Sequence, residues 1–280
     1  MKQFRLFTIF LLALPLWAAT ISMDELQSKT GDANLVILGI NLEGQMIPNS
    51  RVVSYDRVRQ DDNVPAANLF QAAMQAEGIN KDSFVVIVES GEGFGSFHPA
   101  ARLYWTFKYF GHDNVAILEG GMQDWTDMGG DVTEVPRRAA RVRPGNFEAK
   151  APRAELIAST EQVKAAVGKE LIIDARPFAN YIGTVKPPVA QQNGHIQGAK
   201  SAPLDLYFSS GSILRSKADL EKLFADLNID PSKGAITYCN TGSFAAVGWF
   251  VVSEILGHSN RLYDASMKEW DGPVSTVLQN

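Results

Sequence analysis

The chain has 280 residues, with 26 basic and 31 acidic side chains, four histidines and one cysteine. This length fits two domains better than one or three. A content of 45% hydrophobic and 20% charged residues excludes disordered, collagen-like and coiled-coil proteins. The formal net charge of −5 gives no reason to expect a nucleic-acid partner. One cysteine excludes an intramolecular disulfide and a zinc site built from several cysteines.

The first residues have the order of a secretory signal peptide. Residues 1–5 carry two cations, residues 6–17 are almost wholly apolar, and two alanines follow. The apolar run is short of the roughly 20 residues that a membrane span needs. We therefore predict a signal peptide over residues 1–19 and a periplasmic or secreted protein. The alternative is an uncleaved leader, which would be the protein's one attachment to a membrane.

The rest of the chain consists of two similar halves. Gly78–Glu89 matches Asn228–Cys239 at an offset of 150, whereas Phe110–Asn114 matches Leu256–Asn260 at an offset of 146. The first half therefore has four extra residues after its buried strand. Residues 134–155 contain three prolines and five arginines, a composition typical of a linker. We predict domains over 20–133 and 156–280.

Short apolar strands alternate with longer helical stretches in each half. The predicted strands include Phe84–Val88, Leu171–Asp174 and Ala235–Tyr238, and the predicted helices include Ala218–Leu227 and Ala245–Leu256. This alternation predicts an α/β fold in which each domain has a mainly parallel sheet with helices on both faces. Sites in such sheets lie at the carboxyl ends of the strands, and Cys239 directly follows a predicted strand.

Cys239 stands between this strand and a predicted apolar helix, with the turn Asn240–Gly242 after it. Such a turn is expected to aim backbone N–H groups and the positive end of the helix dipole at the sulfur. Because that environment favours the thiolate, the pattern predicts nucleophilic catalysis. The alternative is a buried, inert cysteine, the form in which an exported protein tolerates a lone thiol.

Other cysteine chemistries fit less well. A cysteine phosphatase requires an arginine six residues after the cysteine, but Ala245 stands there and no basic residue occurs between Cys239 and Glu254. A papain-like hydrolase is compatible with the spacing, although none of the four histidines has a supporting local signature. The glycine-rich run 91–95 lacks dinucleotide-loop spacing and is interpreted as a turn that packs on the other domain. Since no histidine or carboxylate set has metal-ligand spacing, we expect no metal and no cofactor.

The sequence resembles the tandem-domain rhodaneses, the thiosulfate and 3-mercaptopyruvate sulfurtransferases. The residues that carry this resemblance are Gly95–Phe97, Ala101–Arg102, Phe110–His112, Gly120–Gly121, Trp125, Asp174–Arg176, Tyr181, Gly194–Ala199, the Cys239 loop and Trp270. It implies two rhodanese-like domains, the second catalytic and the first inactive. Consistent with this, Glu89 occupies the position in the first half that corresponds to Cys239.

The resemblance also implies a reaction. Cys239 would take a sulfane sulfur from a small anionic donor, 3-mercaptopyruvate or thiosulfate, and pass it from a persulfide to a thiophilic acceptor such as cyanide or a thiol. A monomer is expected. The substrate-binding residues implied by the family are Asn240, Thr241, Gly242, Ser243, Phe244, Arg176 and Asn180.

Three features of the sequence bear on how the donor would bind. Asn180 stands where active members carry a donor-binding arginine, residues 240–242 are uncharged as in the mercaptopyruvate type, and Phe244 is unusually bulky. The alternative function is therefore a sulfur-carrier or binding protein with little turnover, and a third interpretation is a redox-sensing thiol. Arg176 has an alternative role as the structural partner of Asp174.

The remaining polar residues are interpreted as structural. His195 is expected to fix a turn, and His112 and His258 follow glycines at matching helix ends. His98 is assigned to the extra loop of the first half, and Asp61–Asp62 to a solvated acidic turn.

Overall fold

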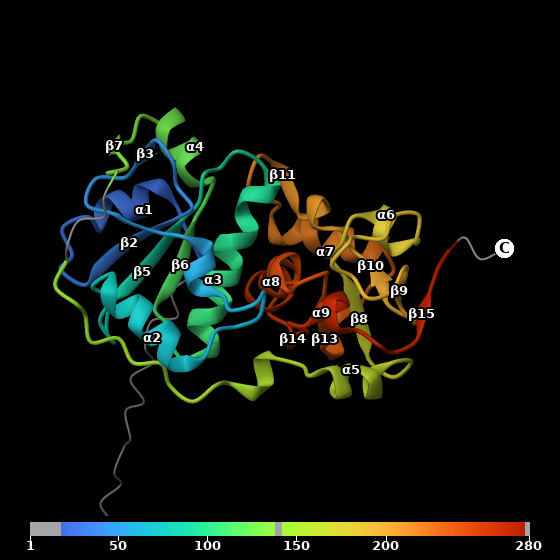
Figure 1. The fold of residues 1–280 in the computed structure, drawn as a ribbon. Helices are drawn as coiled ribbons and strands as arrows, with labels where there is room; N and C mark the ends of the chain where they lie inside the picture. Colours follow the sequence, from blue (N-terminus) through green and yellow to red (C-terminus); the bar gives the residue numbers. More distant parts are fainter. Residues whose placement is uncertain (1–17, 138–141, 278–280) are drawn as a thin grey trace, which may run out of the picture.

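The computed structural model describes residues 18–137 and 142–277 and contains two α/β domains that lie side by side (Figure 1). The first 17 residues of the predicted signal peptide lie outside the described residues. Among the residues that are described, no helix is long and apolar enough to cross a membrane.

The first domain is built on a five-stranded parallel sheet in the order β1-β6-β5-β2-β4. Its strands are β1 (Thr20–Ile21), β2 (Leu35–Ile40), β4 (Arg51–Val53), β5 (Phe84–Val88) and β6 (Val115–Leu118). Its helices are α1 (Met23–Ser28), α2 (Ala67–Ala76), α3 (Phe97–Tyr109) and α4 (Gly121–Asp127). Alternate residues of β5 face opposite ways, because strand side chains have a period of two. Val85 and Ile87 share a core with α2 and α3, whereas Val86 and Val88 share one with α1 and α4.

The second domain repeats this plan with a parallel sheet in the order β10-β8-β13-β14. Its strands are β8 (Leu171–Asp174), β10 (Lys200–Ser201), β13 (Ala235–Tyr238) and β14 (Asn260–Leu262). Its helices are α5 (Thr160–Ala166), α6 (Phe178–Tyr181), α7 (Lys217–Asp226), α8 (Ser243–Phe250) and α9 (Ser266–Glu269). An isolated parallel bridge from Ile157 to Leu262 takes the place that β1 has in the first sheet. The predicted α/β fold and internal repeat are confirmed.

Three short antiparallel pairs complete the fold. They join β3 (Gln45–Met46) to β7 (Thr133–Glu134), β9 (His195–Ile196) to β15 (Val274–Ser275), and β11 (Phe208–Ser210) to β12 (Ile213–Leu214).

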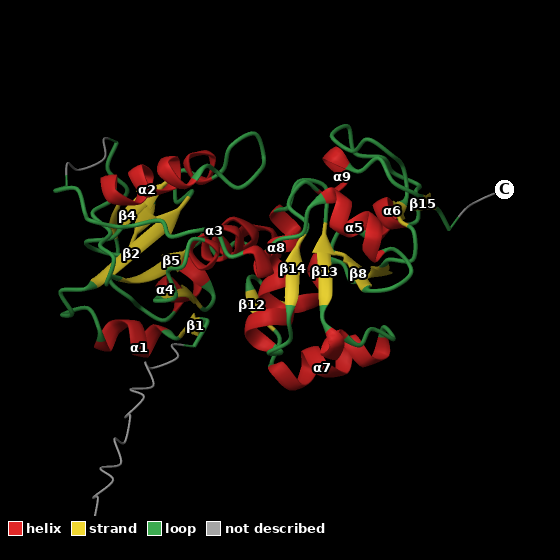
Figure 2. Cartoon of the chain, turned by 90° about the horizontal axis from the view of Figure 1, so that it is seen from below, coloured by secondary structure: helices red, strands yellow, loops and turns green. Residues whose placement is uncertain are grey.

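The two domains share one hydrophobic core through α3 and α8, which lie next to each other between the sheets (Figures 1 and 2). Phe250 of α8 contacts Phe97 and Tyr104 of α3 edge-on, with ring centroids 5.6 and 4.9 Å apart. The Tyr104 hydroxyl also donates a hydrogen bond to Glu254, 2.8 Å away. The turn after β13 meets the first domain, because Gly242 lies against Arg102 of α3, so a site on this sheet can recruit side chains from the other domain.

Residues 142–155, the later part of the segment predicted to be a linker, run along the outside of the molecule toward the second domain (Figure 1). Part of it belongs to the first domain, because the Phe147 side chain is buried against Phe70 and its N–H donates to the Ile79 carbonyl. Composition identified a connection here but missed this one anchoring aromatic residue.

Candidate active site

Cys239 lies immediately after β13, at the carboxyl end of the second sheet, as the sequence predicts. Its side chain is 2% exposed. The turn that follows ends at Gly242, whose φ of 76° is left-handed and favours glycine. An added Cβ at Gly242 would lie 2.5 Å from Nη1 of Arg102, so close approach also requires glycine here. Helix α8 begins at Ser243, and its first N–H groups have no partner within the helix.

Ser266 holds the Cys239 turn in place. Its hydroxyl oxygen accepts hydrogen bonds from the N–H groups of Cys239 and Gly242, at 3.0 and 3.2 Å, and donates to the Tyr263 carbonyl at 2.8 Å. Two of the N–H groups expected to point at the sulfur are therefore bound to a hydroxyl instead. That expectation was wrong for these two groups because it considered the turn without its neighbours in α9.

Sequence reasoning missed Ser266, although the repeat contained a signal. Its counterpart in the first domain is Gly121, and both residues have positive φ, 52° for Ser266 and 59° for Gly121. A serine in this conformation is strained relative to glycine. In the first domain the corresponding turn is bound by Glu89, whose carboxylate accepts the Gly91 N–H at 2.6 Å. In the second domain the Ser266 hydroxyl thus binds the N–H groups of the turn, whereas in the first domain the Glu89 carboxylate binds the N–H of Gly91.

Arg176 is tied to Asp174 rather than presented to the thiol. Its Nε and Nη2 donate to the Asp174 carboxylate, and Nη2 also donates to the Gly194 carbonyl at 2.7 Å. Burial disfavours the charged guanidinium, but Asp174 outweighs it and raises the pKa of Arg176. The Tyr238 hydroxyl donates to the same carboxylate at 2.5 Å. The arrangement favours the structural role for Arg176.

Asn180 is also turned into the protein. Its side chain is 7% exposed, and its amide donates to the Val185 carbonyl at 3.1 Å. Among the residues implied to bind substrate, only those from 240 to 244 lie in the turn that follows Cys239 and in the start of α8. Arg176, which is paired with Asp174, does not place its cation on that turn, and Asn180 is neutral.

The first domain covers the Cys239 turn with polar and aromatic side chains. The Tyr55 hydroxyl, in a 3₁₀ turn at Tyr55–Val58, hydrogen bonds with the Ser243 hydroxyl. The His98 ring lies 5.2 Å from the Phe244 ring and 5.8 Å from that of Tyr55. Burial raises the pKa of Tyr55 and lowers that of His98 to about 4, so both side chains are neutral at pH 7.

Arg102 of α3 reaches the same turn and forms an ion pair with Asp264, which follows β14. The second carboxylate oxygen of Asp264 accepts the Val64 N–H at 2.7 Å. Both members of the pair are buried. Sequence reasoning noted Arg102 as part of a family motif but could not place it beside Cys239, because the contact joins residues of different domains.

One assignment of a polar residue was wrong, and another was incomplete. His98 lies in the first turn of α3 and faces Phe244, because the eight-residue loop 89–96 ends before it. Asp61–Asp62 is a turn with Asp61 exposed, as predicted, but it also contacts the other domain, since Lys268 donates to the Asp61 carbonyl at 2.6 Å and pairs with Asp62. Residues 91–95 do pack on the other domain as predicted, through Phe94 against Phe208.

The remaining histidines have backbone partners. The His195 Nδ1 lies 2.7 Å from the Tyr181 carbonyl, and the ring stacks on Tyr181. His112 and His258 follow glycines with positive φ, and their N–H groups close the ends of α3 and of the π-helical turn Val251–Ile255 that continues α8. Within the described ranges, no three His, Cys, Asp or Glu side chains come together as metal ligands.

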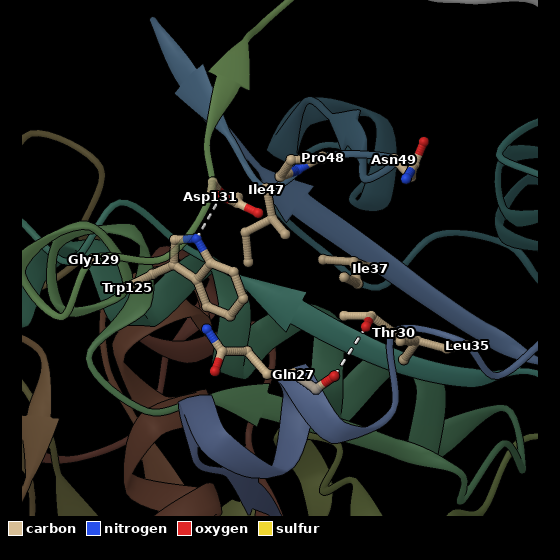
Figure 3. A pocket seen from close by; sticks show the side chains of 10 residues that line it. All are labelled: Gln27, Thr30, Leu35, Ile37, Ile47, Pro48, Asn49, Trp125, Gly129 and Asp131. Atoms are coloured by element: carbon tan, nitrogen blue, oxygen red, sulfur yellow. Dashed lines mark hydrogen bonds between the residues drawn. The ribbon is translucent and has the colours of Figure 1, made fainter.

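Phe244, in the Cys239 turn, also lines a cavity of about 730 Å³ whose walls come from the second domain except for Phe94. Exposed Phe94 and Phe178 form two of its walls, and Lys200 and Asp205 provide its charged groups. A second cavity, of about 420 Å³, lies in the first domain beside Trp125 and Gln27 (Figure 3). Its lining residues all belong to the first domain, so it is separate from the Cys239 turn.

Comparison with known proteins is consistent with this architecture. The family described as "Rhodanese-like domain" matches residues 22–128 and 159–272. A Haloferax volcanii protein provisionally named thiosulfate sulfurtransferase is 30% identical over 271 residues, 92% of each chain. A Saccharopolyspora erythraea protein with the same provisional name is 30% identical over 219 residues, 75% of each chain.

Two solved structures share the fold. Tum1 from Saccharomyces cerevisiae has a TM-score of 0.80 and 22% identity, over 94% of this chain and 99% of its own. SseA from Escherichia coli, described with the 3-mercaptopyruvate sulfotransferases, has a TM-score of 0.76 and 23% identity, over 89% and 99%. The chain belongs to the rhodanese family, with two rhodanese-like domains. Its relatives place it among the sulfurtransferases of that family.

Proposed function

We propose that the protein transfers a sulfane sulfur through a persulfide on Cys239. The observation that carries this proposal is the position of the thiol after β13, in a turn that contains Gly242 and leads into α8. The first domain has Glu89 at the corresponding position, so it has no thiol there. The first N–H groups of α8 and its helix dipole favour negative charge at this turn. A thiolate and a persulfide both carry that charge.

The reaction consists of two displacements on sulfur. The Cys239 thiolate attacks the outer sulfur of thiosulfate, and sulfite leaves with the electron pair of the broken S–S bond. With 3-mercaptopyruvate the same attack breaks the C–S bond, and the carbon takes the electron pair and the donor's thiol proton to give pyruvate. Cyanide or an acceptor thiolate then removes the outer sulfur and restores the cysteine thiolate.

Both donors are candidates, because the two relatives at 30% identity are named for thiosulfate, whereas residues 240–242 are uncharged as in the mercaptopyruvate type. The test is cyanide-dependent thiocyanate release with thiosulfate and with 3-mercaptopyruvate, compared with the Cys239→Ala variant. Turnover with either donor that disappears in Cys239→Ala supports the proposal. Absence of thiocyanate with both donors, together with absence of a sulfur adduct on the protein, would overturn it.

A sulfur-carrier role is the second candidate, and the geometry of the turn favours it in one respect. Cys239 is nearly inaccessible, and the cation at position 180 is replaced by an inward-facing asparagine. A carrier would accept one sulfur and release it slowly. A stable persulfide that forms in stoichiometric amount without thiocyanate turnover would support this role over the enzyme.

We also propose that the protein is exported and loses its leader. The charged, apolar and small-residue order of residues 1–19 supports this. The intact mass of protein recovered from the periplasm or medium tests it: a mass lower by the leader supports export with cleavage, and the full mass contradicts cleavage.

A further inference from the structure

An anionic sulfur donor at Cys239 requires positive charge that the second domain does not bring to the turn. Residues 240–244 are uncharged, and no basic residue occurs from 240 to 253. Arg176 is paired with Asp174, and Asn180 is neutral and faces inward. Apart from Lys200, which lines the cavity beside Phe244, a cation at this turn must therefore come from another part of the molecule.

Arg102 of the first domain provides one. Its side chain is 1% exposed, and its Nη1 lies against Gly242, three residues after Cys239, together with the Asp264 carboxylate oxygen that it pairs with. One planar face covers the Trp105 ring, with Cζ 5.1 Å from the ring centroid. The guanidinium is therefore held in a fixed position at the turn by packing from α3.

Arg102 also has unused hydrogen-bonding capacity. Its Nε and Nη2 have no hydrogen-bond partner among the described residues, although both are buried. Buried donors without a partner are costly, and that cost is greater for a charged group. A ligand oxygen or sulfur anion at the turn would satisfy them.

The guanidinium stays charged in this position. Burial opposes the charge, but Asp264, Tyr55 and the Cys239 sulfur favour it and together raise the pKa of Arg102. The Asp264 carboxylate is itself shared, since its other oxygen accepts the Val64 N–H. The Asp264 carboxylate thus interacts with both the Val64 N–H and the Arg102 guanidinium.

We propose that Arg102, from the non-catalytic domain, binds the anionic group of the sulfur donor at Cys239 and stabilises the charged sulfur during transfer. This inference rests on the proposed function. It gives the first domain a direct part in the reaction, since one domain supplies the nucleophile and the other supplies the cation. It also accounts for an active site that has Asn180 in place of a donor-binding arginine.

The competing explanation is that Arg102 and Asp264 form a purely structural pair. Two substitutions separate these roles. Both break the ion pair, but one removes its positive member and the other removes its negative member. Arg102→Met removes the cation from the turn, whereas Asp264→Asn leaves the cation uncompensated and retains an oxygen for the Val64 N–H. A structural pair predicts that both variants change the site in the same direction.

The experiment measures alkylation of the single cysteine by iodoacetate, an anion, and by iodoacetamide, a neutral analogue. The ratio of the two rates reports charge at the thiol, because loosening of the structure affects both reagents alike. We expect Arg102→Met to lower this ratio by about tenfold, Asp264→Asn to raise it, and Arg102→Lys to retain it. Arg153→Met, which breaks an exposed pair with Asp113, is the control and should leave the ratio unchanged.

An unchanged ratio in Arg102→Met, or a decrease in both Arg102→Met and Asp264→Asn, overturns the proposal. If Arg102→Met does not fold, as judged by circular dichroism, the increase expected in Asp264→Asn remains decisive. The readout needs no sulfur transfer. Absence of both thiocyanate release and a sulfur adduct in the wild-type protein would therefore overturn the proposed function, whereas the alkylation ratio tests Arg102 by itself.

Discussion

The Ser266 hydroxyl organises the active-site turn, so its removal is the most informative single change. In Ser266→Ala the N–H groups of Cys239 and Gly242 lose their acceptor inside the protein. Leaving a buried N–H without a partner costs about 1–3 kcal/mol. Two such groups predict a loss of about 2–6 kcal/mol in the free energy of unfolding. Alanine retains the left-handed backbone, so its strain is unchanged.

Ser266→Gly distinguishes the effect of losing the hydroxyl from the effect of backbone strain. Glycine adopts a φ of 52° without penalty, so this variant should be more stable than Ser266→Ala by about 1 kcal/mol. Ser50→Ala is the matched control, because Ser50 is also buried but its hydroxyl has one bond, donated to the Ile47 carbonyl. The control should lose about 1 kcal/mol.

The assay is urea unfolding followed by circular dichroism, with the alkylation rate of Cys239 as a second readout. A loss in Ser266→Ala no greater than in Ser50→Ala would refute the assigned role of the hydroxyl. So would an unchanged alkylation rate in both Ser266 variants, because the turn would then keep its shape without the brace.

Three further predictions follow from buried contacts. Arg176→Met leaves the Asp174 carboxylate buried without its cation and should destabilise the protein by about 3–5 kcal/mol, measured by urea unfolding; a loss below about 1 kcal/mol contradicts a structural role. Gly242→Ala should reduce the initial rate of sulfur transfer at least about tenfold, because a Cβ there strains the backbone and displaces Arg102; a wild-type rate contradicts the close approach. His98 has a pKa of about 4 in the folded protein and 6.5 in the unfolded chain, so its stabilising contribution is present above pH 6.5 and is lost as pH falls toward 4. His98→Phe should therefore reduce the loss of unfolding free energy between pH 6.5 and 4 by about 2 kcal/mol, and an unchanged pH profile contradicts the buried, neutral assignment.

Much of the fold was predictable because its signals are local. The bounds of β5, β8 and β13 agree with the predicted strands, since each is a short apolar run closed by polar residues or glycine. The repeat offset of 150 also places α7 relative to α2. The position of Cys239 at a strand end follows from the same local pattern.

The surroundings of Cys239 were not predictable in the same way, because they depend on contacts between distant segments. Arg102 meets Asp264, and Tyr55 meets Ser243, across the interface that α3 and α8 create. No spacing rule joins residues of two domains. Ser266 is the exception, since a serine aligned with a glycine turn in the twin domain already indicated a side chain with a specific task.

The central claim is that Cys239 carries the sulfur. Intact-mass spectrometry of the protein after thiosulfate, and again after cyanide, tests it most directly. We predict a gain of about 32 Da, one sulfur atom, that disappears with release of thiocyanate and is absent from Cys239→Ala. An unchanged mass after thiosulfate and after 3-mercaptopyruvate, or the same gain in Cys239→Ala, would contradict the account.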